Sequence, residues 1–170
     1  MSELRNLLPN PKPASRSAWT FSKASAIFDD GMQLEGTTDN SYAAGSVTVP
    51  EAGDYIAVAT LVSADNDIGF NGGSCMLVGI YRNDNRLDYR TAPYVGVQHQ
   101  YVIPFTVPED YTKRKIDVIL RTPLLGDAAS NSCRWARVGV FTTAHWQAMQ
   151  EQNIEWFDGD SYLTRGGLAS

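Results

Sequence analysis

Paired aspartates are the residues of this sequence whose type and spacing best suit acid–base catalysis. They are Asp29 with Asp30, Asp65 with Asp67, and Asp158 with Asp160. Two carboxylates that face each other across a cleft, roughly 5 to 9 Å apart, can hydrolyse a glycosidic bond. Each pair here has Gly or Asn beside it, and Asp is common in such turns because its side chain hydrogen-bonds to the backbone. We therefore interpret the pairs as turn residues.

The sequence contains two histidines, His99 and His145, and no recognised nucleophile motif. Gly-x-Ser-x-Gly and His-Glu-x-x-His are absent. The segment 69–73 is rich in glycine, but it lacks the lysine and the following helix that a phosphate-binding loop needs. A Ser/His/Asp set brought together by folding stays open as an alternative. We expect a protein without catalytic activity.

The same aspartates offer the oxygen ligands that Ca²⁺ prefers, since this hard cation takes about six to eight of them. No EF-hand loop is present, so the ligands would have to come from separate loops. Asp158 and Asp160 are the first candidates for such a calcium site, and Asp65 and Asp67 are the second. No other cofactor is expected.

Tyrosines and arginines gather in the middle third of the chain. A pyranose ring stacks its C–H face on an aromatic ring and needs polar partners for its hydroxyls, a mixture typical of ligand sites. The candidate glycan-binding residues are Tyr81, Arg82, Tyr89, Arg90, Tyr94 and Tyr101, with Asn83, Asn85 and Arg86 nearby. The alternative is that these tyrosines are strand residues whose hydroxyl ends reach water.

Short alternating segments separated by turn sequences predict the elements that would position these side chains. About eight strands are expected, at 19–21, 32–34, 43–49, 55–62, 75–81, 100–107, 115–121 and 134–141. Residues 55–62 are mainly apolar on both faces, which indicates a central strand covered on both sides. Pro104 cannot donate a ladder hydrogen bond, so its strand is expected at an edge or a bulge. The pattern predicts an all-β fold, a two-sheet antiparallel jelly-roll sandwich.

One short helix is expected near the carboxyl end, at 143–152. Thr142 or Thr143 can cap its first turn, and a helix of about ten residues must dock on the sandwich to persist. Residues 1–16 contain three prolines and no periodicity, which predicts an extended arm. The expected division is this arm, a sandwich domain at 17–161 that includes the helix, and a tail at 162–170.

The composition limits the class of partner. With 170 residues the chain fits one domain, and its net charge of -5 disfavours nucleic acid and anionic membranes. There is no run of about 18 apolar residues and no secretory signal, so we expect the protein to fold in a cytoplasm. Cys75 and Cys133 belong to no metal-binding motif, and they predict either buried free thiols or a disulfide between neighbouring strands.

Two motifs stand at the ends of this pattern: Asn6–Pro11, which reads Asn-Leu-Leu-Pro-Asn-Pro, and Trp156–Ser161, which follows the helix. Together with the strand Arg134–Phe141, they resemble small β-sandwich modules that recur in minor tail proteins of phages infecting actinobacteria. Those modules are similar to carbohydrate-binding modules of the galactose-binding-like fold. The resemblance covers nearly the whole chain in order. It also implies a structural calcium near the strand ends, which again points to Asp158 and Asp160.

The resemblance implies a phage virion structural protein of the minor tail or fibre type that binds host cell-surface carbohydrate. We expect it in the virion after synthesis in the host cytoplasm. Its expected partners are other virion proteins, further copies of itself and host cell-wall polysaccharide, with no nucleic acid and no membrane. One alternative is a capsid or tail decoration or assembly protein without a glycan ligand. Another is a small glycan-active enzyme, which would need two carboxylates facing each other in a cleft.

Overall fold

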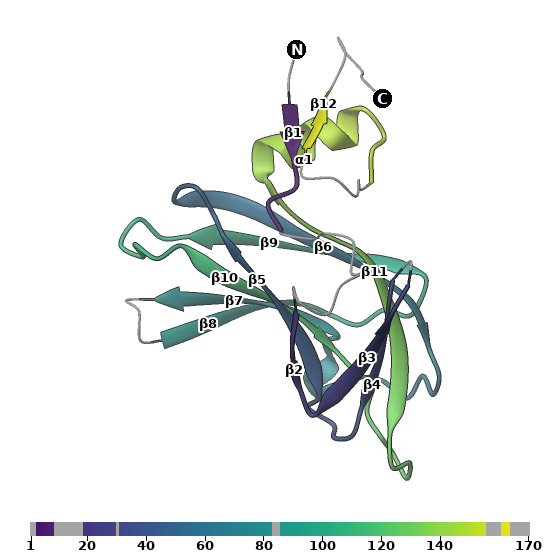
Figure 1. Cartoon of the computed structure of the whole chain (residues 1–170). Helices are drawn as coiled ribbons and strands as arrows, with labels where there is room; N and C mark the ends of the chain where they lie inside the picture. Colours follow the sequence, from purple (N-terminus) through teal and green to yellow (C-terminus); the bar gives the residue numbers. More distant parts are fainter. Residues whose placement is uncertain (1–2, 9–18, 30, 83–85, 156–160, 164–170) are drawn as a thin grey trace.

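The computed structural model describes residues 3–8, 19–29, 31–82, 86–155 and 161–163 (Figure 1). Most of the described strands form two five-stranded antiparallel sheets that pack face to face. Sheet I has the order β2 (Trp19–Ser22), β5 (Tyr42–Thr48), β10 (Lys115–Arg121), β7 (Met76–Arg82) and β8 (Arg86–Ala92). Sheet II has the order β3 (Ala24–Phe28), β4 (Met32–Gly36), β11 (Asn131–Thr142), β6 (Gly53–Ala64) and β9 (His99–Val107). The predicted two-sheet jelly-roll sandwich is confirmed.

The core lies between the two sheets and is built from alternate residues of their strands. In β10 the alternate residues Ile116, Val118 and Leu120 are all buried, as the sequence pattern predicted. Trp135 of β11 is fully buried between the sheets, and its indole N–H donates a hydrogen bond to the carbonyl oxygen of Arg121 at 3.1 Å. The removal of these apolar side chains from water is the main favourable contribution to folding.

β6 is a central strand and β9 is an edge strand of sheet II. β6 pairs with β11 on one side and with β9 on the other, and residues 55–59 are all buried. β9 ends the sheet, and its Pro104 stands opposite Ile56. An edge strand has no ladder on its free side, so it tolerates the missing N–H of proline. Both sequence predictions are confirmed.

The helix α1 (Thr143–Glu151) covers part of the outer face of sheet II. The hydroxyl of Thr142 caps it by accepting a hydrogen bond from the N–H of His145 at 3.1 Å. Met149 is buried and packs with Ile56 and Val58 of β6, which explains why that strand is apolar on both faces. The predicted helix is confirmed and ends one residue early. Among the described residues, no helix has the length and apolar character needed to cross a bilayer.

The two terminal strands pair with each other. β1 (Glu3–Arg5) and β12 (Ser161–Leu163) run antiparallel and lie beside α1 at one end of the sandwich (Figure 1). Beyond β1, Leu8 is buried in the core. The sequence pattern predicted no strand in either segment, and β12 crosses the expected boundary between domain and tail. The division into arm, domain and tail stays a prediction.

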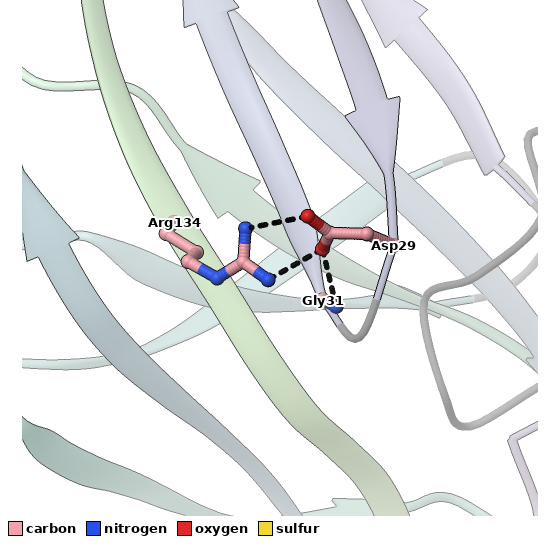
Figure 2. A network of polar contacts seen from close by, with 3 residues as sticks. All are labelled: Asp29, Gly31 and Arg134. Atoms are coloured by element: carbon pink, nitrogen blue, oxygen red, sulfur yellow. Dashed lines mark hydrogen bonds and ion pairs between the residues drawn. The ribbon is translucent and has the colours of Figure 1, made fainter.

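An ion pair holds the turn between β3 and β4 to β11 (Figure 2). The carboxylate of Asp29 accepts hydrogen bonds from Nη1 of Arg134, at 3.3 Å, and from its Nη2. The same carboxylate accepts a hydrogen bond from the N–H of Gly31 at 3.0 Å. Asp29 is therefore a turn residue, as predicted, and its partner Asp30 lies outside the described residues.

Cys75 and Cys133 are both free, fully buried thiols, which is one of the two states that the sequence predicted. Burial raises the pKa of Cys75 to about 12. Burial also raises the pKa of Cys133. Both groups therefore stay protonated at neutral pH, where the thiol is a poor nucleophile.

Candidate functional site

The outer faces of the two sheets differ in how they are covered. α1 packs on β6 and β11 of sheet II. In the described part of the chain, no helix packs on the outer face of sheet I. A binding site on a sheet face is therefore expected on sheet I.

Strand register decides which side chains meet on this face. Cross-strand partners in an antiparallel sheet point to the same side. Tyr89 of β8 stands opposite Gly79 of β7, and one row further along Leu77 of β7 stands opposite Ile119 of β10. Because glycine has no side chain, the ring of Tyr89 has room to lie over the neighbouring strand.

Tyr89, Leu77 and Ile119 help to line a groove of about 280 Å³, which we name the sheet I groove. Its lining residues are Asn40, Tyr42, Leu77, Tyr89, Ile119 and Arg121. Leu77 and Ile119 form an apolar floor on the two middle strands, β7 and β10. Tyr42 on β5 and Tyr89 on β8 stand on either side of this floor, separated by three strand spacings, roughly 14 Å, across the sheet and by four residue positions, roughly 13 Å, along the strands. Tyr89 is 49% exposed, so its ring is accessible to a ligand.

Arg121 links the groove to the short 3₁₀ turn η2 (Asn71–Gly73). Its Nη1 donates a hydrogen bond to the carbonyl oxygen of Asn71 and lies 3.5 Å from the carbonyl oxygen of Ser74. The side-chain amide of Asn71 donates in turn to Oδ1 of Asn40. This chain of contacts positions the polar groups at one end of the sheet I groove.

A second polar pair lies on the same face. Oγ of Ser46 donates a hydrogen bond to Oδ1 of Asp117 at 2.6 Å. The register places Asp117 directly beside Gly79, in the row that begins with Tyr89. A carboxylate accepts several hydrogen bonds, so Asp117 can also accept one from a ligand hydroxyl.

Of the predicted glycan-binding residues, Tyr89 lines the sheet I groove. Arg90, the next residue of β8, does not line it but lines a different hollow. This separation follows from strand geometry, because successive side chains of a strand point to opposite faces. Tyr89 and Arg90 therefore do not line one common binding edge.

Tyr94 and Tyr101 lie away from the groove and bond to other parts of the protein. Tyr101 is 2% exposed, and its hydroxyl donates to the carbonyl oxygen of Gly96 at 2.6 Å. Burial raises the pKa of Tyr101 to about 12. The hydroxyl of Tyr94 donates to a carboxylate oxygen of Asp67, and burial together with this hydrogen bond raises the pKa of Tyr94. Both hydroxyls are thus engaged within the fold.

The remaining predicted site residues cannot be placed by their side chains. Tyr81 and Arg82 belong to β7 by their backbone, but their side chains are outside the described part of the structure. Asp158 and Asp160, the first calcium candidates, also lie outside the described residues. Within the described ranges, no group of three or more His, Cys, Asp or Glu side chains is placed to hold a metal ion. The calcium site stays a prediction.

Tyr89 is the one lining residue of the groove that the sequence predicts, and the other five, Asn40, Tyr42, Leu77, Ile119 and Arg121, were not among the candidates. Tyr42 and Arg121 are register partners on β5 and β10, although they lie far apart in the sequence. The sequence does show an aromatic or polar residue at the end of each of these two strands, since Tyr42 begins β5 and Arg121 ends β10. That signal identifies a surface position, but it does not say which strands are neighbours.

Comparison with solved structures relates this fold to carbohydrate-binding modules. No protein-family model and no curated protein matches the sequence. The fold is similar to the second N-terminal cellulose-binding domain of Cellulomonas fimi β-1,4-glucanase C, with a TM-score of 0.51 and 21% identity over 82% of this chain and 95% of that one. It is also similar to the enzymatically active domain of tailspike protein 4 of bacteriophage CBA120, with a TM-score of 0.50 and 13% identity over 81% of this chain and 21% of that one. The chain has the β-sandwich fold of carbohydrate-binding modules, and at these identities the likeness concerns the fold alone.

Proposed function

We propose that this protein binds a glycan in the sheet I groove. The observation that carries the proposal is the composition of the groove: Tyr42 and Tyr89 stand on either side of an apolar floor, and Arg121 and Asn40 stand at its polar end. Aromatic rings can stack on the C–H faces of a pyranose while the polar groups pair with its hydroxyls. Since the groove crosses four strands, a stretch of an extended glycan chain fits it better than a compact ligand.

We propose that binding occurs without cleavage. Glycoside hydrolysis usually requires two carboxylates on opposite sides of the scissile bond. The residues that line the sheet I groove include no aspartate or glutamate. Asp117 lies on the same face, but it is paired with Ser46 rather than with a second carboxylate.

We further propose that the ligand is host cell-wall polysaccharide and that the protein is a virion component of the minor tail or fibre type. The motifs Asn6–Pro11 and Trp156–Ser161 support this proposal, through their resemblance to phage tail modules. In such a particle, contacts with other virion proteins or further copies of this chain could use the end with α1, β1 and β12. These elements lie on the side of sheet II in Figure 1, so the outer face of sheet I, which carries the groove, would stay open to the host surface.

A second candidate function is that of a decoration or assembly protein without a glycan ligand. One observation favours it: Ile27, on the edge strand β3, is 71% exposed. An exposed apolar side chain on an edge strand can contact another protein. A single exposed residue is common on protein surfaces, so the groove remains the stronger indication.

A direct test is the binding of the purified protein to actinobacterial cells and to their isolated wall polysaccharide. We expect saturable binding that weakens about five- to tenfold in Tyr89→Ala and in Tyr42→Ala, because each change removes a stacking ring worth about 1 kcal/mol or more. Ile27→Ala is the matched control, since it removes an exposed apolar side chain from the other sheet. Thermal unfolding would verify that each variant is folded.

The two candidate functions give opposite results. Binding that Ile27→Ala preserves and the tyrosine variants lose would support the glycan-binding function. Absence of binding by the folded wild-type protein to every cell and polysaccharide preparation would favour the decoration or assembly role. Binding that both tyrosine variants retain in full would remove the sheet I groove as the site.

A further inference from the structure

A second hollow, of about 340 Å³, lies at the edge of the sandwich where β9 of sheet II approaches β8 of sheet I. We name it the β6–β9 hollow. Its lining residues are Asp54, Tyr55, Ile56, Arg90, Pro104, Phe105, Thr106 and Thr143. Its volume falls within the range of about 300 to 1,000 Å³ that is usual for small-ligand sites. None of its residues lines the sheet I groove.

Three parts of the fold build this hollow. Asp54 pairs with Thr106, and Ile56 pairs with Pro104, so register sets these residues of β6 and β9 in two neighbouring rows. Thr143 adds the first residue of α1. β8 brings its edge to β9, and from that edge Arg90 reaches the hollow.

The polar groups of the β6–β9 hollow carry opposite charges. Asp54 accepts a hydrogen bond from Oγ1 of Thr106 at 2.7 Å and keeps further acceptor capacity. The guanidinium of Arg90 donates to the carbonyl oxygen of Tyr89 at 3.1 Å, which uses one of its five donors. Both side chains are exposed, so a ligand can reach them. The hollow thus offers a strong acceptor and a strong donor to the same ligand.

The apolar residues of the hollow complete the description. Ile56 and Pro104 face each other across β6 and β9, and Pro104 is exposed. Beside them, the rings of Tyr55 and Phe105 stack with their centroids 5.7 Å apart, which stiffens this part of the wall. Above this wall the exposed ring of Pro104 offers an apolar surface to the C–H face of a small ring.

We propose that the β6–β9 hollow is a second carbohydrate site, which binds a neutral sugar unit through neighbouring hydroxyls. Each hydroxyl can donate one hydrogen bond and accept others, so a pair of them can donate to Asp54 and accept from Arg90. The opposite charges of these two residues balance, which disfavours a strongly anionic ligand. This inference does not depend on binding in the sheet I groove, because the two sites share no lining residue.

The test is nuclear magnetic resonance of the ¹⁵N-labelled full chain, titrated with the methyl glycosides of glucose, galactose and N-acetylglucosamine, and separately with inorganic phosphate. We expect at least one glycoside to shift the backbone amides of Asp54, Thr106 and Thr143. Arg90→Gln and Asp54→Asn should each weaken this binding about tenfold or more, because a charge-assisted hydrogen bond is lost. Arg137→Gln, which removes an exposed arginine from β11, is the matched control and should have no effect.

The amide resonances also separate the two sites. Shifts at Ile119 and Arg121 report on the sheet I groove, so the groove can fail while the hollow binds, or the reverse. The proposal is overturned if no glycoside shifts the amides of the hollow, or if Arg90→Gln leaves the shifts unchanged. It is also overturned if phosphate alone shifts them, because the hollow would then be an anion site.

Discussion

Asn6 and Val140, which lie 134 residues apart, are joined by a hydrogen bond in the interior of the protein: the N–H of Val140 donates to Oδ1 of Asn6 at 3.0 Å. The side-chain amide of Asn6 donates to the carbonyl oxygen of Val138 at 3.4 Å, and the N–H of Leu7 donates to the carbonyl oxygen of Val140 at 2.7 Å. β4 pairs with β11 only as far as Trp135, so it does not pair with the part of β11 that contains Val138 and Val140. Residues 6 and 7 therefore hydrogen-bond to polar groups of β11 beyond the end of its register with β4.

Replacement of Asn6 by alanine should destabilise the protein by about 1 to 3 kcal/mol, because the hydrogen bonds of Asn6 to a buried N–H and a buried carbonyl are lost. Asn6 is 2% exposed, so water cannot take over these hydrogen bonds without local opening. Urea unfolding would measure the change. Gln147→Ala, at an exposed position of α1, is the control and should stay within about 0.5 kcal/mol of the wild type. An equal effect of the two substitutions would contradict the role of Asn6.

The strands that the sequence predicts well are those that bury one full face. β10 is expected at 115–121 and is observed there, because every second residue, Ile116, Val118 and Leu120, is apolar and buried. β3 was missed, since this edge strand buries Ala26 alone while Ile27 is exposed. The alternation signal depends on burial, so a short edge strand with little buried surface does not produce it.

The lining of the sheet I groove is harder to predict than the fold. Tyrosines and arginines that are close along the chain suggest one site, whereas a sheet surface brings residues together by register. Tyr89 and Arg90 are adjacent in sequence and line different hollows, while Tyr42 and Arg121 are distant in sequence and line the same groove. Register depends on which strands become neighbours, and strand pairing is a property of the whole fold.

Arg121→Gln should loosen the turn Asn71–Gly73, because the guanidinium no longer donates to the carbonyl oxygen of Asn71. The amide of Gly73 donates to the carbonyl oxygen of Phe70 at 3.0 Å. This amide should exchange with solvent about fivefold faster, which corresponds to a loss of ~1 kcal/mol in the free energy of local opening. Hydrogen exchange would measure it. Arg121→Lys keeps the charge without the planar fork and should give an intermediate rate. Unchanged protection of Gly73 in both variants would show that Arg121 does not hold this turn.

Asp29→Asn and Asp29→Ala should separate the two roles of Asp29 in the contact with Arg134 and Gly31 (Figure 2). Asparagine keeps an acceptor for the Gly31 N–H and loses the charge. We therefore expect the free energy of unfolding to fall by about 0.5 kcal/mol at low salt, and this difference to disappear at high salt. Alanine loses both the charge and the acceptor, so the free energy of unfolding should fall by about 0.5 to 1 kcal/mol more, at any salt concentration. Urea unfolding at low and high salt would measure these differences. Equal stability of wild type and Asp29→Asn at low salt would contradict a stabilising ion pair.

Alkaline pH should destabilise the protein through its buried thiols. Burial raises the pKa of Cys75 from 9.0 to about 12, so the folded protein holds this proton more tightly than the unfolded chain does. Below pH 9 both states are protonated and stability is unaffected. Between pH 9 and 12 unfolding releases the proton, so the free energy of unfolding falls by about 1.4 kcal/mol per pH unit for each such group. Cys133, whose pKa burial also raises, adds a similar slope.

Urea unfolding from pH 8 upward should show this fall, and Cys75→Ala should reduce the slope between about pH 9 and 10 by about half. Cavity formation in that variant lowers stability at every pH and leaves the slope untouched, so an unaltered slope would mean that Cys75 is not the titrating group.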